Sequence, residues 1–163
     1  MLKQLAIATP LAMLTLGASV AFAAEESRTA INIVADIPSK VFHAQPVDPN
    51  FGKNEEMRYV IGAGTLSPVR GTYDIQHTQG AVGAYVEGGP QPLFNGANTI
   101  ALAYTFNGKT LTGASQEVVG DTESNGGMRA DLVITAAKPA DGQSGLYTAT
   151  PVVMFDAIPR ITQ

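Results

Sequence analysis

Hydrophobic and polar residues alternate along most of the chain, which is the pattern of strands that bury one face. Beyond residue 23, no stretch of a dozen residues keeps the 3.6-residue period of an amphipathic helix. The alternation predicts strands over 29–38, 57–63, 68–78, 81–86, 99–111 (two strands), 128–136 and 146–157, with a short strand starting at 41. Short strands separated by turn residues indicate an all-β domain of the immunoglobulin-like sandwich type.

Turn residues divide these strands and set the connections between them. Asn107-Gly108 between two strand-like runs favours a type I′ hairpin. Residues 43–56 and 87–98, with their prolines, glycines and asparagines, predict two long loops. Residues 121–127 predict a solvated acidic turn, and Pro151 predicts an edge position or a bulge in the last strand.

Residues 1–23 have the features of a cleaved export signal: a positive charge, a short apolar stretch and an A-x-A cleavage site (Lys3, Leu5 to Leu16, Ala21 to Ala23). The alternative is a membrane anchor, because Leu5 to Ala24 has roughly the length of a spanning helix. Pro10 and Gly17 interrupt that stretch and favour the signal. We therefore expect the mature chain to begin at Ala24.

Composition narrows the class of protein. The 163 residues include no Cys and no Trp, 45% are hydrophobic and 15% are charged, with a net charge of −4. These values differ from those of disordered and disulfide-rich chains, and the absence of a basic cluster argues against nucleic acid as a partner. An exported chain without cysteine must be stabilised by packing or by a partner.

The residues that carry chemistry are sparse, and they predict no enzyme, no cofactor and no metal. His43 and His77 lack a partner at metal-ligand spacing, so both are interpreted as surface residues. Glu55 and Glu56 are adjacent and would point to opposite faces of a strand, which does not suit paired-carboxylate catalysis. A loop site formed by Glu55, Glu56 and His77 stays as the weakest hypothesis.

The most informative feature is a strongly patterned strand close to the cleavage site. It places five alternate residues on one face and ends at Pro38, the five being Thr29, Ile31, Ile33, Ala35 and Ile37. A terminus this apolar must be docked. It either pairs within its own domain as an ordinary first strand or completes the sheet of a neighbouring molecule by strand addition.

Three segments carry a resemblance to a known family. They are INIVADIP near the start, IALAYTFNGKTLTG in the middle and DLVITAAKPADGQSGLYTATPVVMFDA at the end. In order and spacing they resemble the major pilins of α-clade chaperone-usher fimbriae, the group of the CFA/I-type, cable-pilus and Cup-type subunits. The resemblance covers roughly half of the mature chain, over about 31–38 and 99–157, and is poor in the loops between.

The resemblance implies an incomplete immunoglobulin-like β-sandwich, completed by a donor strand from a neighbouring subunit. It divides the chain into a signal peptide (1–23), a donor-strand segment (24–38) and a pilin domain (39–163). The alternate residues of the donor strand, Thr29, Ile31, Ile33, Ala35 and Ile37, would enter an acceptor groove. On the last strand, Val153, Phe155 and Ala157 would line that groove.

We therefore expect a major fimbrial subunit that polymerises by donor-strand exchange, for adhesion or biofilm formation. The implied partners are identical subunits, a periplasmic chaperone, an outer-membrane usher and a tip adhesin, and the implied route leads through the periplasm to a surface fimbrium. The alternative is a self-contained secreted β-sandwich that binds carbohydrate or protein, which would be a stable soluble monomer.

Overall fold

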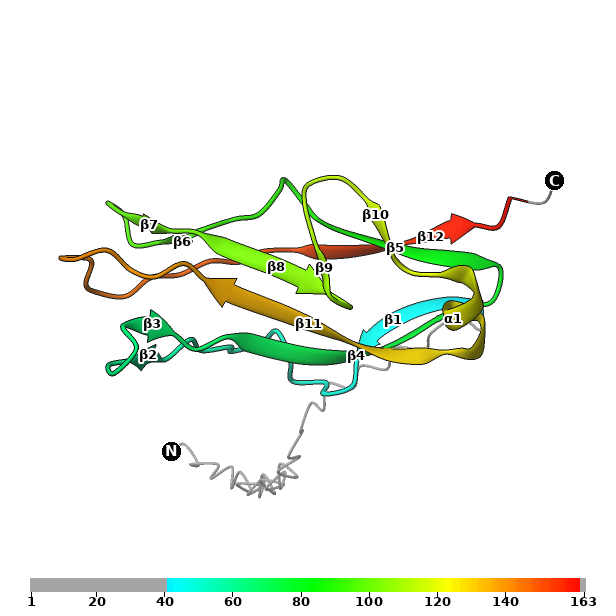
Figure 1. Ribbon diagram of the computed structural model, residues 1–163, viewed down its shortest axis with the longest axis horizontal. Helices are drawn as coiled ribbons and strands as arrows, with labels where there is room; N and C mark the ends of the chain where they lie inside the picture. The colour runs from blue at the N-terminus through cyan, green and yellow to red at the C-terminus, as the bar shows by residue number, and fades with distance from the viewer. Residues whose placement is uncertain (1–40, 162–163) are drawn as a thin grey trace, which may run out of the picture. The chain divides into compact units, whose positions relative to one another are not determined.

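The computed structural model describes residues 41–161, and Figure 1 shows them as two layers of antiparallel strands. The predicted signal peptide and donor strand lie outside these residues. The elements are β1 (Phe42–Pro46), β2 (Tyr59–Val60), β3 (Thr65–Leu66), β4 (Val69–His77), β5 (Gly80–Val86), β6 (Leu93–Phe94), β7 (Thr99–Ile100), β8 (Leu102–Phe106), β9 (Lys109–Thr110), β10 (Gln116–Val119), α1 (Asp121–Gly126), β11 (Met128–Ala136) and β12 (Val153–Pro159). The predicted all-β class is confirmed. No helix in the described part of the chain is long and apolar enough to cross a membrane.

The two layers are a five-stranded sheet in the order β1-β4-β11-β8-β9 and a three-stranded sheet in the order β10-β5-β12. Two short ribbons, β2–β3 and β6–β7, lie outside these layers. Every strand pair among residues 41–161 is antiparallel, which allows each sheet to bury one face and expose the other.

The core fills the space between the layers. Its largest fully buried side chains are Tyr104, Phe106, Ile75, Leu111, Val82, Val86, Val118 and Val119. Strand β4 shows how the sequence pattern builds this core: Val69 and Gly71 are buried, whereas Arg70 and Thr72, which alternate with them, are exposed. The predicted division of this strand into a packed and a wet face is confirmed.

The predicted Asn-Gly hairpin is also confirmed, between β8 and β9. Asn107 has φ 49° and Gly108 has φ 76°, so both central residues are in the left-handed region that a type I′ turn requires. Asn107 also donates from its side-chain amide to the carbonyl of Val118 (2.8 Å), which ties the turn to β10.

Three predicted boundaries are wrong at the edges of the sandwich. The predicted loop 43–56 begins as strand, because residues 43–46 belong to β1 and pair with β4. Pro46 ends that edge strand, where its missing N–H disrupts little. The strand predicted over 57–63 is only β2, and the loop predicted over 87–98 contains β6.

Two further corrections concern the C-terminal half. The strand predicted from 146 begins only at Val153, so Pro151 lies before the strand rather than within it. In the predicted N-terminal part of this strand, Thr148 alone pairs, with Phe94. A strand needs a neighbour along its length, and that pairing covers one position. The turn predicted over 121–127 is the short helix α1, held by the buried Ser124, whose hydroxyl donates to the Gly80 carbonyl (2.6 Å).

Candidate functional site

Strand β12 lies at the edge of the three-stranded sheet. Its only strand neighbour among residues 41–161 is β5, with Val153 opposite Val86 and Phe155 opposite Ala84. Since Val86 and Ala84 are fully buried, this register places Val153 and Phe155 on the core face. Both side chains are nevertheless only partly buried, and Ala157 is exposed.

The alternation of main-chain hydrogen bonds between β5 and β12 shows which N–H and carbonyl groups of β12 point away from β5. The Glu87 N–H donates to the Val152 carbonyl and the Arg160 N–H to the Gln79 carbonyl, both at 2.9 Å. Hydrogen-bonded positions alternate in an antiparallel ladder, so the even-numbered residues of β12 face β5. The N–H and carbonyl groups of Val153, Phe155 and Ala157 therefore point away from β5. The edge can accept another strand beside the same residues that face the core.

A groove of about 1180 Å³ opens between the two layers next to this edge. Its apolar walls are Val69, Tyr73, Leu102, Leu132 and Ile134 from the five-stranded sheet and Val153 from β12. Its rim is formed by residues 51–57, by the β2–β3 hairpin and by the segment 138–151. In the part of the chain that the structure describes, the sandwich is thus open along one side, where its core residues line a surface groove.

Aromatic rings fill the middle of the sandwich beside the groove. Phe155 contacts Tyr73 (centroids 5.2 Å apart) and Phe106 (4.9 Å), in tilted and edge-to-face arrangements. Such pairs contribute about 0.5–1.5 kcal/mol beyond the area that they bury. Phe155 therefore links β12 to the opposite sheet. Burial of the Tyr73 side chain in this cluster raises its pKa above the usual 10.0.

Phe51 supplies another ring from the segment after β1. Its ring lies over Gly71 of β4, where an added Cβ would come within 2.5 Å of the ring atoms. The centroid of the Phe51 ring lies 6.0 Å from that of the Tyr73 ring. A compact turn holds Phe51: its N–H donates to the Asp48 carbonyl (3.0 Å), and the Gly52 N–H donates to the Glu55 carboxylate (3.1 Å). Gly71 thus provides the space for a ring at the groove.

Two side-chain interactions fix β12 in place, although one of its edges has no strand neighbour among residues 41–161. The Ser115 hydroxyl donates to the Asp156 carboxylate (2.8 Å), above Gly83 of β5. At the far end, Arg160 makes a two-point contact with Asp121 of α1 (2.5 and 2.6 Å). The hydrogen bond from Arg160 is the main reason that the pKa of Asp121 is lowered. The edge is therefore held in position and open on one side.

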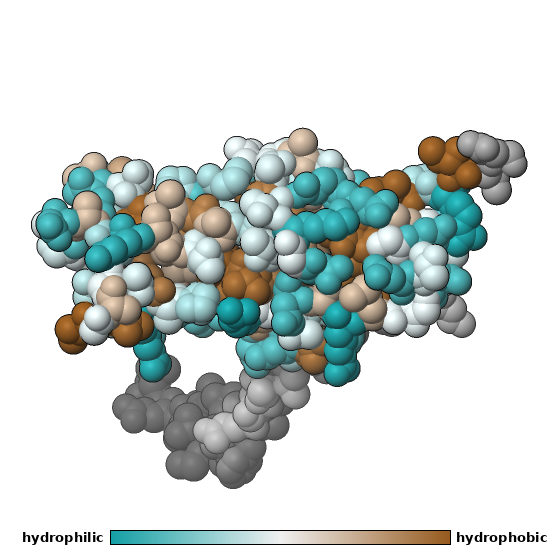
Figure 2. All heavy atoms as spheres, in the orientation of Figure 1, coloured by the Kyte–Doolittle hydropathy of each residue, from teal (hydrophilic) through white to brown (hydrophobic). Residues whose placement is uncertain are grey.

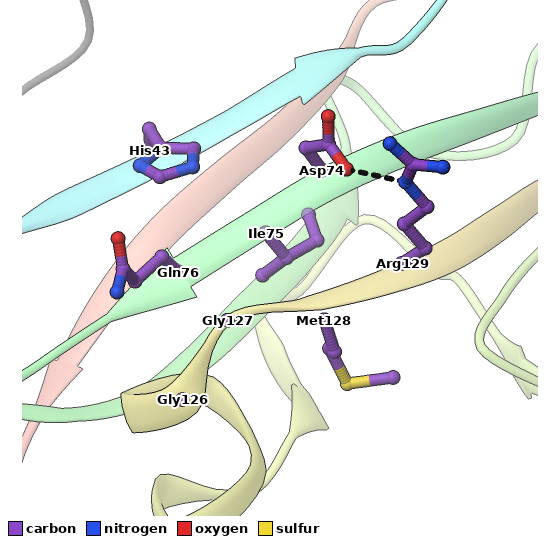
Figure 3. Close-up of a pocket in the computed structure, with 8 residues that line it drawn as sticks. All are labelled: His43, Asp74, Ile75, Gln76, Gly126, Gly127, Met128 and Arg129. Atoms are coloured by element: carbon purple, nitrogen blue, oxygen red, sulfur yellow. Dashed lines mark hydrogen bonds and ion pairs between the residues drawn. The ribbon is translucent and has the colours of Figure 1, made fainter.

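A second hollow, of about 480 Å³, lies on the outer face of the five-stranded sheet and is shown in Figure 3. Its polar side chains are His43 from β1, Asp74 and Gln76 from β4, and Arg129 from β11. Arg129 is paired with Asp74 (2.8 Å), and both side chains are largely exposed. Such an exposed pair is typical of a solvated sheet face.

The predicted histidine positions need one correction. His77, expected at the surface, is buried: its Nδ1 lies 2.9 Å from the Ala81 carbonyl and its ring contacts Phe42 edge to face. Glu55 and Glu56 line the rim of the groove, whereas His77 does not. Within residues 41–161, no group of three or more His, Cys, Asp or Glu side chains is placed to hold a metal.

Of the predicted acceptor residues, the structure places Val153 in the groove, Phe155 in the aromatic cluster beside it and Ala157 farther along the same face of β12. The donor residues lie outside the described part of the chain. Sequence reasoning missed the part of the opposite wall where Phe51, packed over Gly71, lines the groove beside Tyr73. The one available signal was Gly71 on the packed face of a strand, which is typical of a close approach.

Within residues 41–161, the fold and the open edge define an immunoglobulin-like β-sandwich in which no strand lies on the outer side of β12. A family model for the CS1 type fimbrial major subunit matches residues 27–156. Among solved structures, the chain is similar to the CooA pilin subunit from enterotoxigenic Escherichia coli, with TM-score 0.52 and 13% identity, covering 69% of this chain and 86% of that one. A search of curated proteins found no match.

The family match covers most of the chain, so the chain belongs to the CS1 type fimbrial major subunits. It is a major fimbrial subunit. Membership in this family implies a structural rather than an enzymatic role, assembly into pili through a chaperone and an usher, and a place in a surface fimbrium.

Proposed function

We propose that the groove beside β12 receives residues 29–37 of another copy of this chain, which fills the missing strand position and links the subunits into a filament. The observation that carries this proposal is the open edge of β12 next to an apolar groove. The donor strand runs antiparallel to β12, like the paired strands within each of the two sheets.

The donor and the groove match in length and polarity. Nine extended residues span about 30 Å, enough to run along the whole of β12. Their patterned face meets the walls around Tyr73, Leu132 and Val153. Burial of three isoleucines at about 1.5–3 kcal/mol each contributes roughly 5–9 kcal/mol as an upper estimate, before main-chain hydrogen bonds are counted. This rivals the stability of a whole domain.

The same groove explains why a periplasmic chaperone is needed. An unpaired edge beside exposed core residues promotes aggregation until it is covered. The chaperone covers the groove during export through the periplasm, and the donor strand replaces it at the outer-membrane usher. A tip adhesin ends the filament, and the filament serves adhesion or biofilm formation.

The geometry of the joint determines the kind of assembly. Each copy gives a strand at one site and receives one at another, so the contact is heterologous and produces an open filament. The chain has no cysteine to crosslink the copies. Durability therefore depends on slow unfolding of each joint.

The test is to shear surface material from producing cells, run it on SDS gels with and without heating, and image it by electron microscopy. We expect thin filaments and a ladder of oligomers that disappears on heating. A single monomer band without filaments would contradict the proposal and favour the secreted binding module.

A further inference from the structure

The β2–β3 hairpin exposes a run of large apolar residues at one end of the sandwich. Ile61 at its turn is 88% exposed, and Tyr59 and Val60 before it are exposed as well. On the neighbouring segment 138–151, Leu146 is 82% exposed. Figure 2 shows hydrophobic residues at the surface at the end where Figure 1 places β2 and β3. We call these four residues the apolar tip.

The hairpin that carries the apolar tip is a well-defined element. The Arg58 N–H donates to the Ser67 hydroxyl (2.9 Å), and the Ser67 N–H donates to the Arg58 carbonyl (2.8 Å), which closes its base. Its turn closes through the Gly64 N–H to the Val60 carbonyl (2.8 Å). A Cβ at Gly64 would lie 3.3 Å from Lys138, so the hairpin rests against the segment that carries Leu146.

The apolar tip is continuous with the rim of the groove, because Tyr59 and Leu146 also line it. An antiparallel donor strand passes from the C-terminal end of β12 toward its start and leaves the groove at this rim. The body of the donor subunit begins at Phe42, only five residues after Ile37. Five extended residues reach at most about 18 Å. The start of the donor subunit's β1 is therefore held close to the apolar tip.

The end of the sandwich where β1 starts also exposes apolar side chains. Val41 precedes β1 and is 41% exposed, and Ile161 after β12 is 88% exposed. Both lie at the α1 end: the Thr78 N–H donates to the Val41 carbonyl, and Arg160, next to Ile161, pairs with Asp121 of α1. Each copy thus carries exposed apolar residues at both ends, and the short connection between subunits brings unlike ends together.

We propose that the apolar tip packs against the α1 end of the next copy, forming a second contact that sets the angle between consecutive subunits. This inference rests on the proposed donor-strand exchange. The inserted strand supplies the strength of the joint, whereas the tip contact restricts its bending. Loss of the tip contact therefore leaves subunits linked but the filament more flexible.

The experiment compares filaments of the full chain with those of the double variant Val60→Asp and Ile61→Asp, two exposed residues of the apolar tip that do not line the groove. The control is Val47→Asp, which changes a 43% exposed valine beside the middle of β4, where its N–H donates to the Thr72 carbonyl. Unheated SDS gels report strand exchange, and contour curvature in electron micrographs gives the persistence length. We expect the double variant to keep its ladder but lose helical order, with a severalfold shorter persistence length, whereas the control keeps both.

An unchanged persistence length in the double variant would overturn the inference. If the cells carrying these unchanged filaments no longer attached to surfaces, the apolar tip would instead be a receptor site. Loss of the ladder in the double variant alone would also overturn it, because the tip would then act in strand exchange itself. Should the aspartates prevent export, Ile61→Thr tests the same contact with a milder change. A missing ladder in the unmodified chain refutes the proposed function instead.

Discussion

The two sides of the sandwich have similar residues and differ in their closure. On the side of β8, β9 and β10, Phe106, Leu111 and Val118 are at most 1% exposed. On the side of β12, Val153 and Phe155 face the same core yet stay partly buried. Strand β5 has a neighbour on each side, whereas β12 has one among the described residues. Burial here is therefore limited by the number of strands rather than by the hydrophobicity of the sequence.

The largest expected effect comes from a charge on the strand that would close the open side. Ile33→Asp should abolish polymerisation while a chaperone-bound subunit stays folded, because an unpaired carboxylate in an apolar groove is strongly unfavourable. The readout is the oligomer ladder together with the yield of the chaperone complex. Val34→Asp, which changes the opposite face of the same strand, is the matched control and should polymerise far better. Filaments of Ile33→Asp at the normal level would show that the donor assignment is wrong.

Phe155→Ala tests whether the contacts of Phe155 with Tyr73 and Phe106 stabilise the sandwich on the side of β12. Removal of this partly buried ring should destabilise the subunit by about 2–4 kcal/mol, near the lower part of the range for buried aromatic residues. Met154→Ala, which changes the outer face of the same strand, should cost less than about 1 kcal/mol. Denaturant unfolding of the chaperone-bound subunits measures both. Equal losses would mean that β12 does not orient Phe155 into the cluster.

Gly71→Ala should perturb the groove by a smaller amount, because its methyl group meets the Phe51 ring. Overpacking of this kind costs about 1–3 kcal/mol. In a Phe51→Ala background the same substitution should cost little, so a double-mutant cycle on the free energy of unfolding isolates the contact. Additive effects of the two changes would contradict the packing of Phe51 over Gly71.

The smallest effect concerns alkaline pH. Burial raises the pKa of Tyr73 above 10.0, so the folded state keeps the proton longer than the unfolded state does. The contribution of Tyr73 to stability is therefore complete below pH 10.0 and is lost as pH rises through the raised pKa. Tyr73→Phe should reduce the loss of stability in this range, as measured by unfolding at a series of pH values. An identical pH profile would place the dependence elsewhere, with Tyr104 as the next candidate.

The sequence best predicted the strands that pair with another strand on both sides. Strand β11 occupies the predicted residues 128–136, and β4 differs from its prediction by one residue at each end. The wrong boundaries, such as the strand expected from 146, lie at edges, where pairing depends on a partner rather than on local alternation. Helix α1 was missed because its stability depends on Ser124 reaching Gly80, a contact that no local pattern reveals.

The candidate groove was predictable on one wall only. Alternation along the last strand pointed to Val153 and Phe155 as a face. The opposite wall requires the approach of Phe51 to Gly71 and of Tyr73 to Phe155, which depends on the register between distant segments. Phe51 lies within a polar segment that gave no sign of a core residue, so its role became visible only in three dimensions.

The most direct measurement uses the absence of cysteine from the chain. Ile33→Cys is combined in turn with Val153→Cys and with Ala157→Cys, and surface material is run on heated gels without a reducing agent. Cysteines on paired strands are close enough to form a disulfide. We expect at least one combination to give a covalent ladder that collapses on reduction. A disulfide formed only within a monomer would mean that the strand closes its own sandwich and would contradict strand exchange.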